Sequence, residues 1–354
     1  MDKRKKIGIG GAVFLVLLVL AVLFHQNQEQ KELSRYTASF LDVFDTRTDI
    51  VGYSTSEEDF VSQVSLLKER LEYYHKLFDI YNDYEGINNI KTINDNAGVA
   101  PVKVSQDIID LLIFSQEMYE LTDGEMNIAM GSVLKIWHNY RDAGINDPEN
   151  AKLPPMEELE AASAYCGILG MEINEIEGTV YLPDANMSLD VGGIGKGYAV
   201  QRVAEYAKEI GMESVLLSVG GNICAVGHKT DGSAWGVGIQ NPDLNSEEAY
   251  VEKVLASDVS VVTSGDYQRY YVVDGEKYCH IIDRDTLMPA NYFVSVTIIT
   301  EDSGKADALS TAVFNMPFED GQVFVNRLEG VEAMWVFEDG TIEYSDNFKQ
   351  YTAE

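Results

Sequence analysis

The chain has 354 residues, of which 58 are acidic and 26 are basic, so its formal net charge is −32. Such an acidic protein is not expected to bind nucleic acid, and it is a poor match for an anionic lipid surface. The cysteines Cys166, Cys224 and Cys279 form no C-x-x-C pair, which argues against a cysteine zinc site. They could supply one disulfide outside the cell or remain buried free thiols.

The N-terminus predicts a membrane anchor. Residues 3–6 read Lys-Arg-Lys-Lys, and residues 7–24 form an uncharged apolar run near the lower length limit for a membrane-spanning helix. Basic residues before such a run place the N-terminus in the cytoplasm and the bulk of the chain outside. A cleaved signal peptide is the alternative, but the run is long for one and Phe24-His25 is a poor cleavage site. We therefore expect a single-pass protein of the cell membrane, with a cytoplasmic segment (1–6), an anchor (7–24), a tether (25–35) and an extracytoplasmic body (36–354).

The first part of the body alternates strand-like and helical patterns. Residues 35–53 are strand-like, and a helix follows in which apolar residues recur at spacings of three and four. These apolar residues are Phe60, Val64, Leu67, Leu71, Tyr74 and Phe78. Thr55 and Glu58 are expected to form a capping box at its start. Ser105 can cap a second helix that continues to Leu121, and residues 171–182 predict a hairpin.

A glycine-rich run, Gly192-Gly193-Ile194-Gly195-Lys196-Gly197, lies between an apolar segment and a helical pattern. Glycines let the backbone approach a ligand closely, and a helix N-terminus favours an anion. The run therefore predicts an anionic, phosphorylated ligand. It matches neither the P-loop nor the dinucleotide fingerprint in spacing, and a tight strand-to-helix turn is the structural alternative.

The second part of the body predicts further strands at residues 214–219, 235–239 and 259–262. Residues 263–266 are expected to form a polar turn, and His280 to Asp283 to end a strand-like segment. Asp307 and Thr311 lie four residues apart in a helical stretch, so both side chains project from one face. A carboxylate and a hydroxyl are oxygen ligands suited to Mg²⁺, although such a pair on a solvated helix face carries no function.

Five ordered segments resemble the ApbE family of flavin transferases. They are residues 189–199, 219–222, 263–267, 280–283 and 306–312, and the resemblance extends from Tyr36 to the C-terminus. It implies an α+β fold, related to the T-fold, in which sheets are flanked by helices. It also implies a Mg²⁺-dependent enzyme that splits FAD, attaches FMN by a phosphoester bond to a Thr or Ser of an acceptor flavoprotein and releases AMP. The implied acceptor is a membrane-associated electron-transfer protein.

The resemblance also implies roles for particular residues. Flavin contacts are expected at Phe44, Tyr81, Glu125, Met126, Asn127 and Ile282. Lys196 would supply a positive charge near the cofactor, and Mg²⁺ would be held by Asp307, Thr311 and the backbone carbonyl of Gly193. His280 and Asp307 are both candidates for the general base. The chain departs from the family pattern at residues 81–89, which lack the usual serines, at Asn127 and Gln201, where aspartate is usual, and at residues 284–287.

Two other functions fit the same motifs. A metal-dependent FAD pyrophosphatase would use the same site with water as the nucleophile, giving FMN and AMP. An exported flavin-binding protein without enzymatic activity would hold FAD without turnover.

Overall fold

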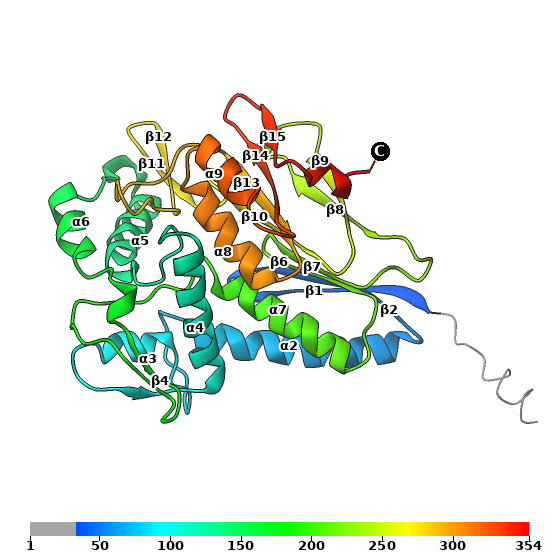
Figure 1. Ribbon diagram of the computed structural model, residues 1–354, viewed down its shortest axis with the longest axis horizontal. Helices are drawn as coiled ribbons and strands as arrows, with labels where there is room; N and C mark the ends of the chain where they lie inside the picture. The colour runs from blue at the N-terminus through cyan, green and yellow to red at the C-terminus, as the bar shows by residue number, and fades with distance from the viewer. Residues whose placement is uncertain (1–32, 354) are drawn as a thin grey trace, which may run out of the picture.

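The computed structural model describes residues 33–353. Over this range the chain forms an eight-stranded antiparallel sheet in the order β1-β2-β6-β7-β10-β13-β14-β15 (Figure 1). Smaller sheets are formed by β3-β5-β4, by β8-β9 and by β11-β12. The strands are β1 Ser34–Val43, β2 Thr46–Ser54, β3 Val102–Lys103, β4 Glu172–Asn174, β5 Thr179–Tyr181, β6 Val215–Val219, β7 Asn222–Val226, β8 Trp235–Gln240, β9 Tyr250–Ala256, β10 Ser260–Gly265, β11 Tyr270–Val273, β12 Glu276–Cys279, β13 Ser295–Thr300, β14 Glu332–Val336 and β15 Ile342–Tyr344.

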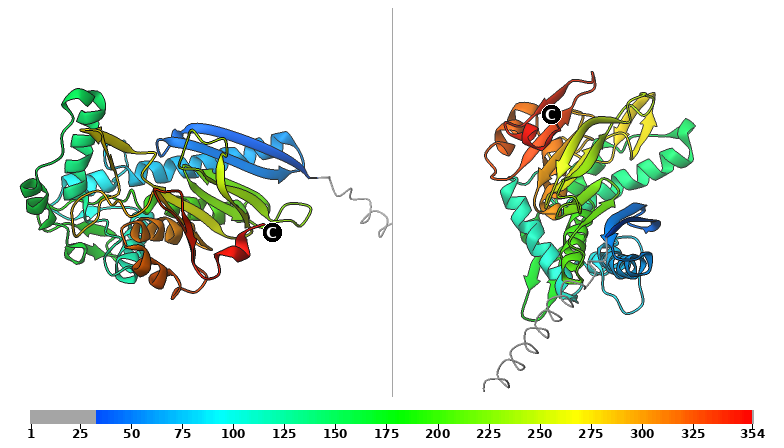
Figure 2. Two further views of the ribbon diagram at one scale, coloured as in Figure 1. Left: turned by 90° about the horizontal axis from the view of Figure 1, so that it is seen from above. Right: turned by 90° about the vertical axis from the view of Figure 1, so that its right-hand side faces the viewer.

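The helices gather in two places. The long helices α2, α7 and α8 pack against the large sheet, whereas α3 to α6 gather at one end of the molecule with strands β3 to β5, β11 and β12 (Figures 1 and 2). The other face of the sheet is covered by β8 and β9, whose Trp235 and Val254 pack against Val261 and Ile299. The helices are α2 Glu57–Phe78, α3 Ile90–Asp95, α4 Gln106–Leu121, α5 Gly131–Asn146, α6 Met156–Ser163, α7 Gly195–Glu209, α8 Ser303–Phe314 and α9 Phe318–Val325.

Several expectations from the sequence are confirmed. All six apolar residues expected on the core face of α2 are buried. Helix α4 begins after Ser105 and ends at Leu121, although the Ser105 side chain makes no capping hydrogen bond, and β4 and β5 form the expected hairpin. The strand-like residues 35–53 are two strands, which meet at a tight turn where Phe44 and Asp45 both have positive φ.

Two local expectations were wrong. The N-cap of α2 is Ser56, whose side chain accepts a hydrogen bond from the Asp59 amide, so the cap lies one residue after the expected Thr55–Glu58 box. Residues 263–265 continue β10, because Gly265 pairs with Ser295 of β13, and no turn begins at Thr263. In both places a polar sequence fits more than one backbone conformation, and the neighbouring strand or helix decides between them.

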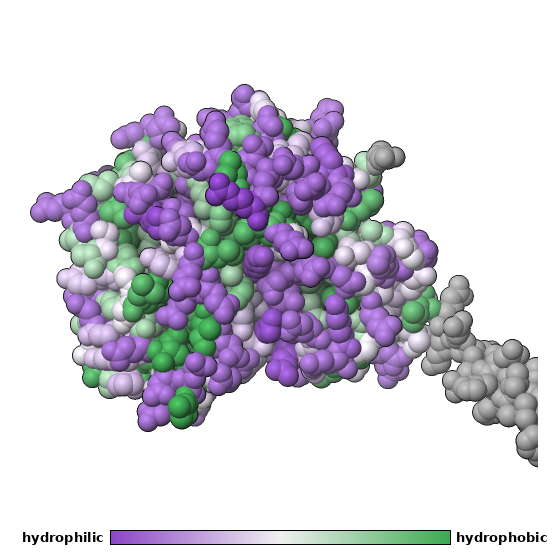
Figure 3. Space-filling model, in the orientation of Figure 1, coloured by the Kyte–Doolittle hydropathy of each residue, from purple (hydrophilic) through white to green (hydrophobic). Residues whose placement is uncertain are grey.

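The surface of the described chain is largely hydrophilic, with apolar side chains gathered mainly near α4 in this view (Figure 3). Cys166, Cys224 and Cys279 are free thiols. Between residues 33 and 353 no helix has the length and apolar character needed to cross a membrane. The expected anchor at 7–24 and nearly all of the tether lie outside the described residues.

Helices α7 and α8 approach each other closely at Gly197. A Cβ atom at this position would lie 2.3 Å from the Ser303 carbonyl oxygen and 2.4 Å from the Asp307 Cβ. Only glycine therefore allows this contact. The contact places the end of the glycine run directly against the Asp307 side chain.

Replacing Gly197 with alanine should disrupt this helix pair. We expect Gly197→Ala to reduce the free energy of unfolding by about 2 kcal/mol or more, as for overpacked cores. Gly167→Ala is the matched control, because a Cβ there meets no atom of residues 33–353 within 4 Å. Urea unfolding measures both variants. Equal stability of Gly197→Ala and Gly167→Ala would contradict the close contact.

Candidate active site

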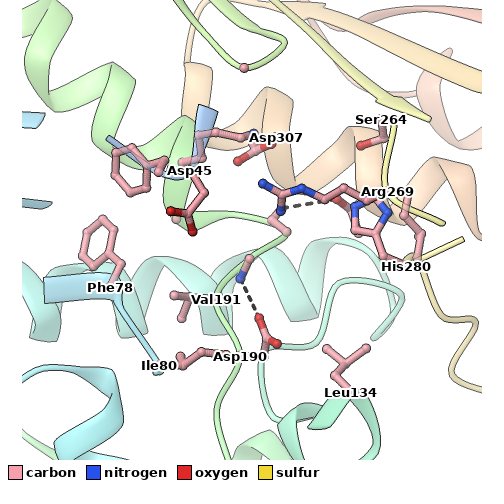
Figure 4. A pocket seen from close by; sticks show the side chains of 18 of the residues that line it. Asp45, Phe78, Ile80, Leu134, Asp190, Val191, Ser264, Arg269, His280 and Asp307 are labelled. Carbon is pink, nitrogen blue, oxygen red and sulfur yellow. Dashed lines mark hydrogen bonds and ion pairs between the residues drawn. The ribbon is translucent and has the colours of Figure 1, made fainter. Parts of the chain in front are cut away.

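A cavity of about 520 Å³ opens where the glycine run meets β10, α8 and the segments after α2 and α4 (Figure 4). The residues that the sequence assigns to the site come from distant parts of the chain. All of them line this one cavity: Phe44, Tyr81, Glu125, Met126, Asn127, Gly193, Lys196, His280, Ile282, Asp307 and Thr311. The structure thus brings the residues together, and their individual roles remain predictions.

Asp307 is the central charged group of the cavity. Asp307 is 4% exposed, and its Oδ2 accepts a 2.7 Å hydrogen bond from the Gly197 amide. The Lys196 Nζ lies 3.5 Å from Asp307 Oδ1 and also donates to the Asn222 Oδ1. Burying a carboxylate without hydrogen-bond partners is costly, and these contacts offset that cost. The glycine run supplies both an amide and an ammonium to it.

The expected magnesium ligands are adjacent. One turn of α8 separates Asp307 from Thr311, and the Thr311 hydroxyl donates to the Gly193 carbonyl oxygen at 3.3 Å. No group of three or more His, Cys, Asp or Glu side chains that could hold a metal occurs within residues 33–353. A site with one carboxylate, one hydroxyl and one carbonyl fits Mg²⁺, which keeps waters and is completed by substrate phosphates.

His280 faces the cavity from the segment after β12, with Arg269 beside it (Figure 4). Its Nδ1 is buried and has no hydrogen-bond partner among the described residues. Burial, together with the positive charges of Arg269 and Arg141, lowers the pKa of His280 to about 3. The imidazole is therefore neutral at physiological pH, with a nitrogen available to a ligand.

The corner between α4 and α5 brings Glu125, Met126 and Asn127 to the cavity. The Asn127 side chain holds the corner, because its amide donates to the Cys166 carbonyl and its oxygen accepts from the Ala129 amide. Glu125 is paired with Arg284, 3.3 Å away. Arg284 belongs to residues 284–287, where the sequence departs from the family pattern. This departure therefore supplies the basic partner of Glu125.

The aromatic side of the cavity is formed by Phe44 and Tyr81. The Phe44 amide donates to His75 Nδ1 at 3.3 Å, and the two rings meet edge to face. Asp79 organises the loop that carries Tyr81, since it accepts hydrogen bonds from the Tyr81 amide, the Asn82 amide and side chain, and the Tyr84 hydroxyl. Burial alone would raise the pKa of Asp79, but these hydrogen bonds hold it below its usual value.

Sequence reasoning missed several residues that line the cavity. They are Asp79, His138, Arg141, Asp190 and Arg269. His138 and Arg141 lie three residues apart on α5, and the other three lie in separate segments. The usable signals were the position of Asp79 directly after a helix and of Asp190 two residues before the glycine run.

Glu125 makes stability depend on pH. Burial is the main cause that raises its pKa to about 7, and Arg284 opposes this shift. A carboxyl group with a raised pKa stabilises the fold while it is protonated, and this contribution is lost as the pH rises through 7.

We therefore expect the stability of Glu125→Gln relative to the wild type to increase by about 1–2 kcal/mol when the pH is raised from 5 to 8. Urea unfolding of both proteins at the two pH values measures this difference. A stability difference that stays constant with pH would show that Glu125 does not titrate in this range.

Comparisons with known proteins agree with the geometry. The sequence model of the ApbE family matches residues 44–335. An FAD:protein FMN transferase from Treponema pallidum is 32% identical over 270 residues, which cover 72% of each chain. Another, from Escherichia coli K12, is 28% identical over 95% of this chain and 94% of its own length. The crystal structure of the ApbE protein from Thermotoga maritima superposes with a TM-score of 0.79 and 30% identity, covering 91% of this chain and 100% of that one. The chain belongs to the ApbE family and has its α+β fold.

Proposed function

We propose that the chain is an FAD:protein FMN transferase. It would cleave the pyrophosphate of FAD, attach FMN to a Ser or Thr hydroxyl of an acceptor flavoprotein, and release AMP. The convergence of Lys196, Asp307, Thr311 and His280 on one cavity carries this proposal. The names of the relatives described above support the same reaction.

Phosphoryl transfer depends mainly on positioning and on stabilising charge. Lys196 is held by Asp307 and Asn222, so its ammonium is fixed beside the glycine run. When bound, Mg²⁺ would neutralise pyrophosphate charge, and Gly193, Asp307 and Thr311 are the residues that would hold it. The donor set described above supports this cation.

His280 and Asp307 are both candidates for the general base. Asp307 already accepts a hydrogen bond from Gly197 and is paired with Lys196, whereas His280 has an Nδ1 without a partner among the described residues but a pKa of about 3, which makes it a weak base. The acceptor hydroxyl would lose its proton to one of these two groups as its oxygen bonds to the FMN phosphorus. The bond between that phosphorus and the bridging oxygen would break, and AMP would leave.

Fluorescence in a denaturing gel tests the proposed activity. Residues 31–354 are incubated with FAD, Mg²⁺ and acceptor flavoproteins from the same cell, and labelled acceptor bands are expected. Formation of FMN and AMP without a labelled protein would instead indicate a pyrophosphatase. FAD that remains bound and intact would indicate a carrier.

We expect Asp307→Asn to reduce transfer by at least about 100-fold, because the substitution keeps the shape of the side chain and removes the one anionic metal ligand. Transfer rate is measured against Mg²⁺ concentration, with circular dichroism as the test of folding. Asp320→Asn makes the same change of charge at an exposed position on α9 and should behave as the wild type. A wild-type rate at low Mg²⁺ for Asp307→Asn would place the metal elsewhere.

We also propose that the body is extracytoplasmic and acts on a membrane-associated acceptor. The basic residues 3–6 before the apolar run 7–24 support this location. An exterior-active reporter fused to the C-terminus should give a signal, and a protein lacking residues 1–30 should keep full transfer activity. A signal only from a cytoplasm-active reporter would reverse the orientation.

A further inference from the structure

A chain of three polar side chains crosses one side of the cavity. The Tyr81 hydroxyl lies 2.9 Å from His138 Nδ1, and His138 Nε2 lies 3.8 Å from Asp190 Oδ2. Tyr81 follows α2, His138 belongs to α5, and Asp190 precedes the glycine run, so the contacts join three separate segments. All three residues line the cavity. We refer to them as the Tyr81–His138–Asp190 relay.

At 3.8 Å, His138 and Asp190 are in electrostatic contact without a hydrogen bond, so the relay contains one hydrogen bond, between Tyr81 and His138. The surroundings fix the direction of that bond. Burial lowers the pKa of His138, and Asp190 only partly opposes this effect, so the ring is neutral at pH 7. A neutral imidazole carries one proton, and the carboxylate facing Nε2 favours the proton on that nitrogen. Nδ1 is then an acceptor, and the Tyr81 hydroxyl donates to it. A tyrosine hydroxyl is protonated at pH 7, so it can donate this hydrogen bond.

The inner end of the relay reaches the glycine run. The second carboxylate oxygen of Asp190, Oδ1, accepts a 2.8 Å hydrogen bond from the Gly192 amide (Figure 4). The Asp190 amide in turn donates to the Ile128 carbonyl, beside the Glu125–Asn127 corner. Gly192 precedes Gly193, whose carbonyl is the proposed magnesium ligand. The position of Asp190 therefore influences the loop that would receive the phosphates.

The outer end of the relay presents an aromatic ring to a ligand. Tyr81 is 60% exposed although it lines the cavity, so its ring is not held by core packing. Its backbone is fixed by Asp79, and its hydroxyl is fixed by His138. The ring is thus pre-oriented, which reduces the entropy lost when a flat ligand binds against it.

We propose that His138 is a positioning residue for FAD, acting through Tyr81 and Asp190. It holds the Tyr81 ring at the cavity and links it to the glycine run, so that flavin binding and the geometry of the phosphate loop depend on each other. This inference rests on the proposed function, because it takes FAD as the ligand.

Two substitutions at His138 distinguish the hydrogen bond that positions Tyr81 from the volume that the imidazole ring fills. His138→Phe keeps a ring of similar size and removes both nitrogens, whereas His138→Gln keeps one acceptor and one donor. We expect His138→Phe to weaken FAD binding by about fivefold, the value of one lost hydrogen bond, and His138→Gln to stay close to wild type. Quenching of flavin fluorescence measures the dissociation constant without an acceptor protein.

Tyr81→Phe tests the same link from the exposed end, where the substitution does not threaten folding. It should weaken FAD binding about as much as His138→Phe, and the double variant should be no weaker than the worse single one. His138→Phe and Tyr81→Phe should also raise the Mg²⁺ concentration for half-maximal AMP release by a few-fold. Wild-type FAD affinity in either Phe variant, or effects that multiply in the double variant, would overturn the proposal.

The proposed function can fail independently of this inference. If the wild type binds FAD and the variants show the expected losses of FAD affinity, but the wild type labels no protein, the transferase proposal fails and the relay stands. If transfer occurs but the variants bind FAD as the wild type does, the relay fails and the transferase proposal stands.

Discussion

The site depends on the hydrogen bond between the Gly197 amide and the Asp307 carboxylate. It joins the first turn of α7 to the middle of α8 at a point where no other residue fits in place of glycine. The same contact places Lys196 beside Asp307 and Gly193 beside Thr311. A buried charge, its counter-ion and two further oxygen atoms are therefore assembled by the packing of two helices on one sheet.

The composition of the chain is in conflict with its proposed ligand. A chain of net charge −32 repels an anion such as FAD at long range. Three basic side chains line the cavity, Arg141, Lys196 and Arg269, but five acidic side chains line it too: Asp45, Asp79, Glu125, Asp190 and Asp307. The cavity therefore does not reverse the charge of the whole protein, and a bound cation would have to neutralise the phosphates. Association is expected to rely on short-range contacts and the metal, with little help from steering.

Much of the fold and site could be predicted from the sequence because the signals were local. The apolar face of α2, the glycine run and the Asp307–Thr311 pair each depend on residues a few positions apart. The relay could not be predicted, because Tyr81, His138 and Asp190 meet only after three segments have packed. The capping residue of α2 was missed for a different reason, since Thr55 and Ser56 are chemically equivalent caps and the exact start of the helix decides between them.

The hairpin of β1 and β2 sets a distance that matters for the acceptor. Strand β1 begins at Ser34, and its far end turns at Phe44, which lines the cavity. At about 3.3 Å for each residue, the ten residues of β1 form an extended strand roughly 30 Å long. On the proposed anchor, this strand and the tether before it would together set how far from the membrane the cavity can reach. Acceptor hydroxyls beyond that reach would then not be modified, whatever the sequence around them.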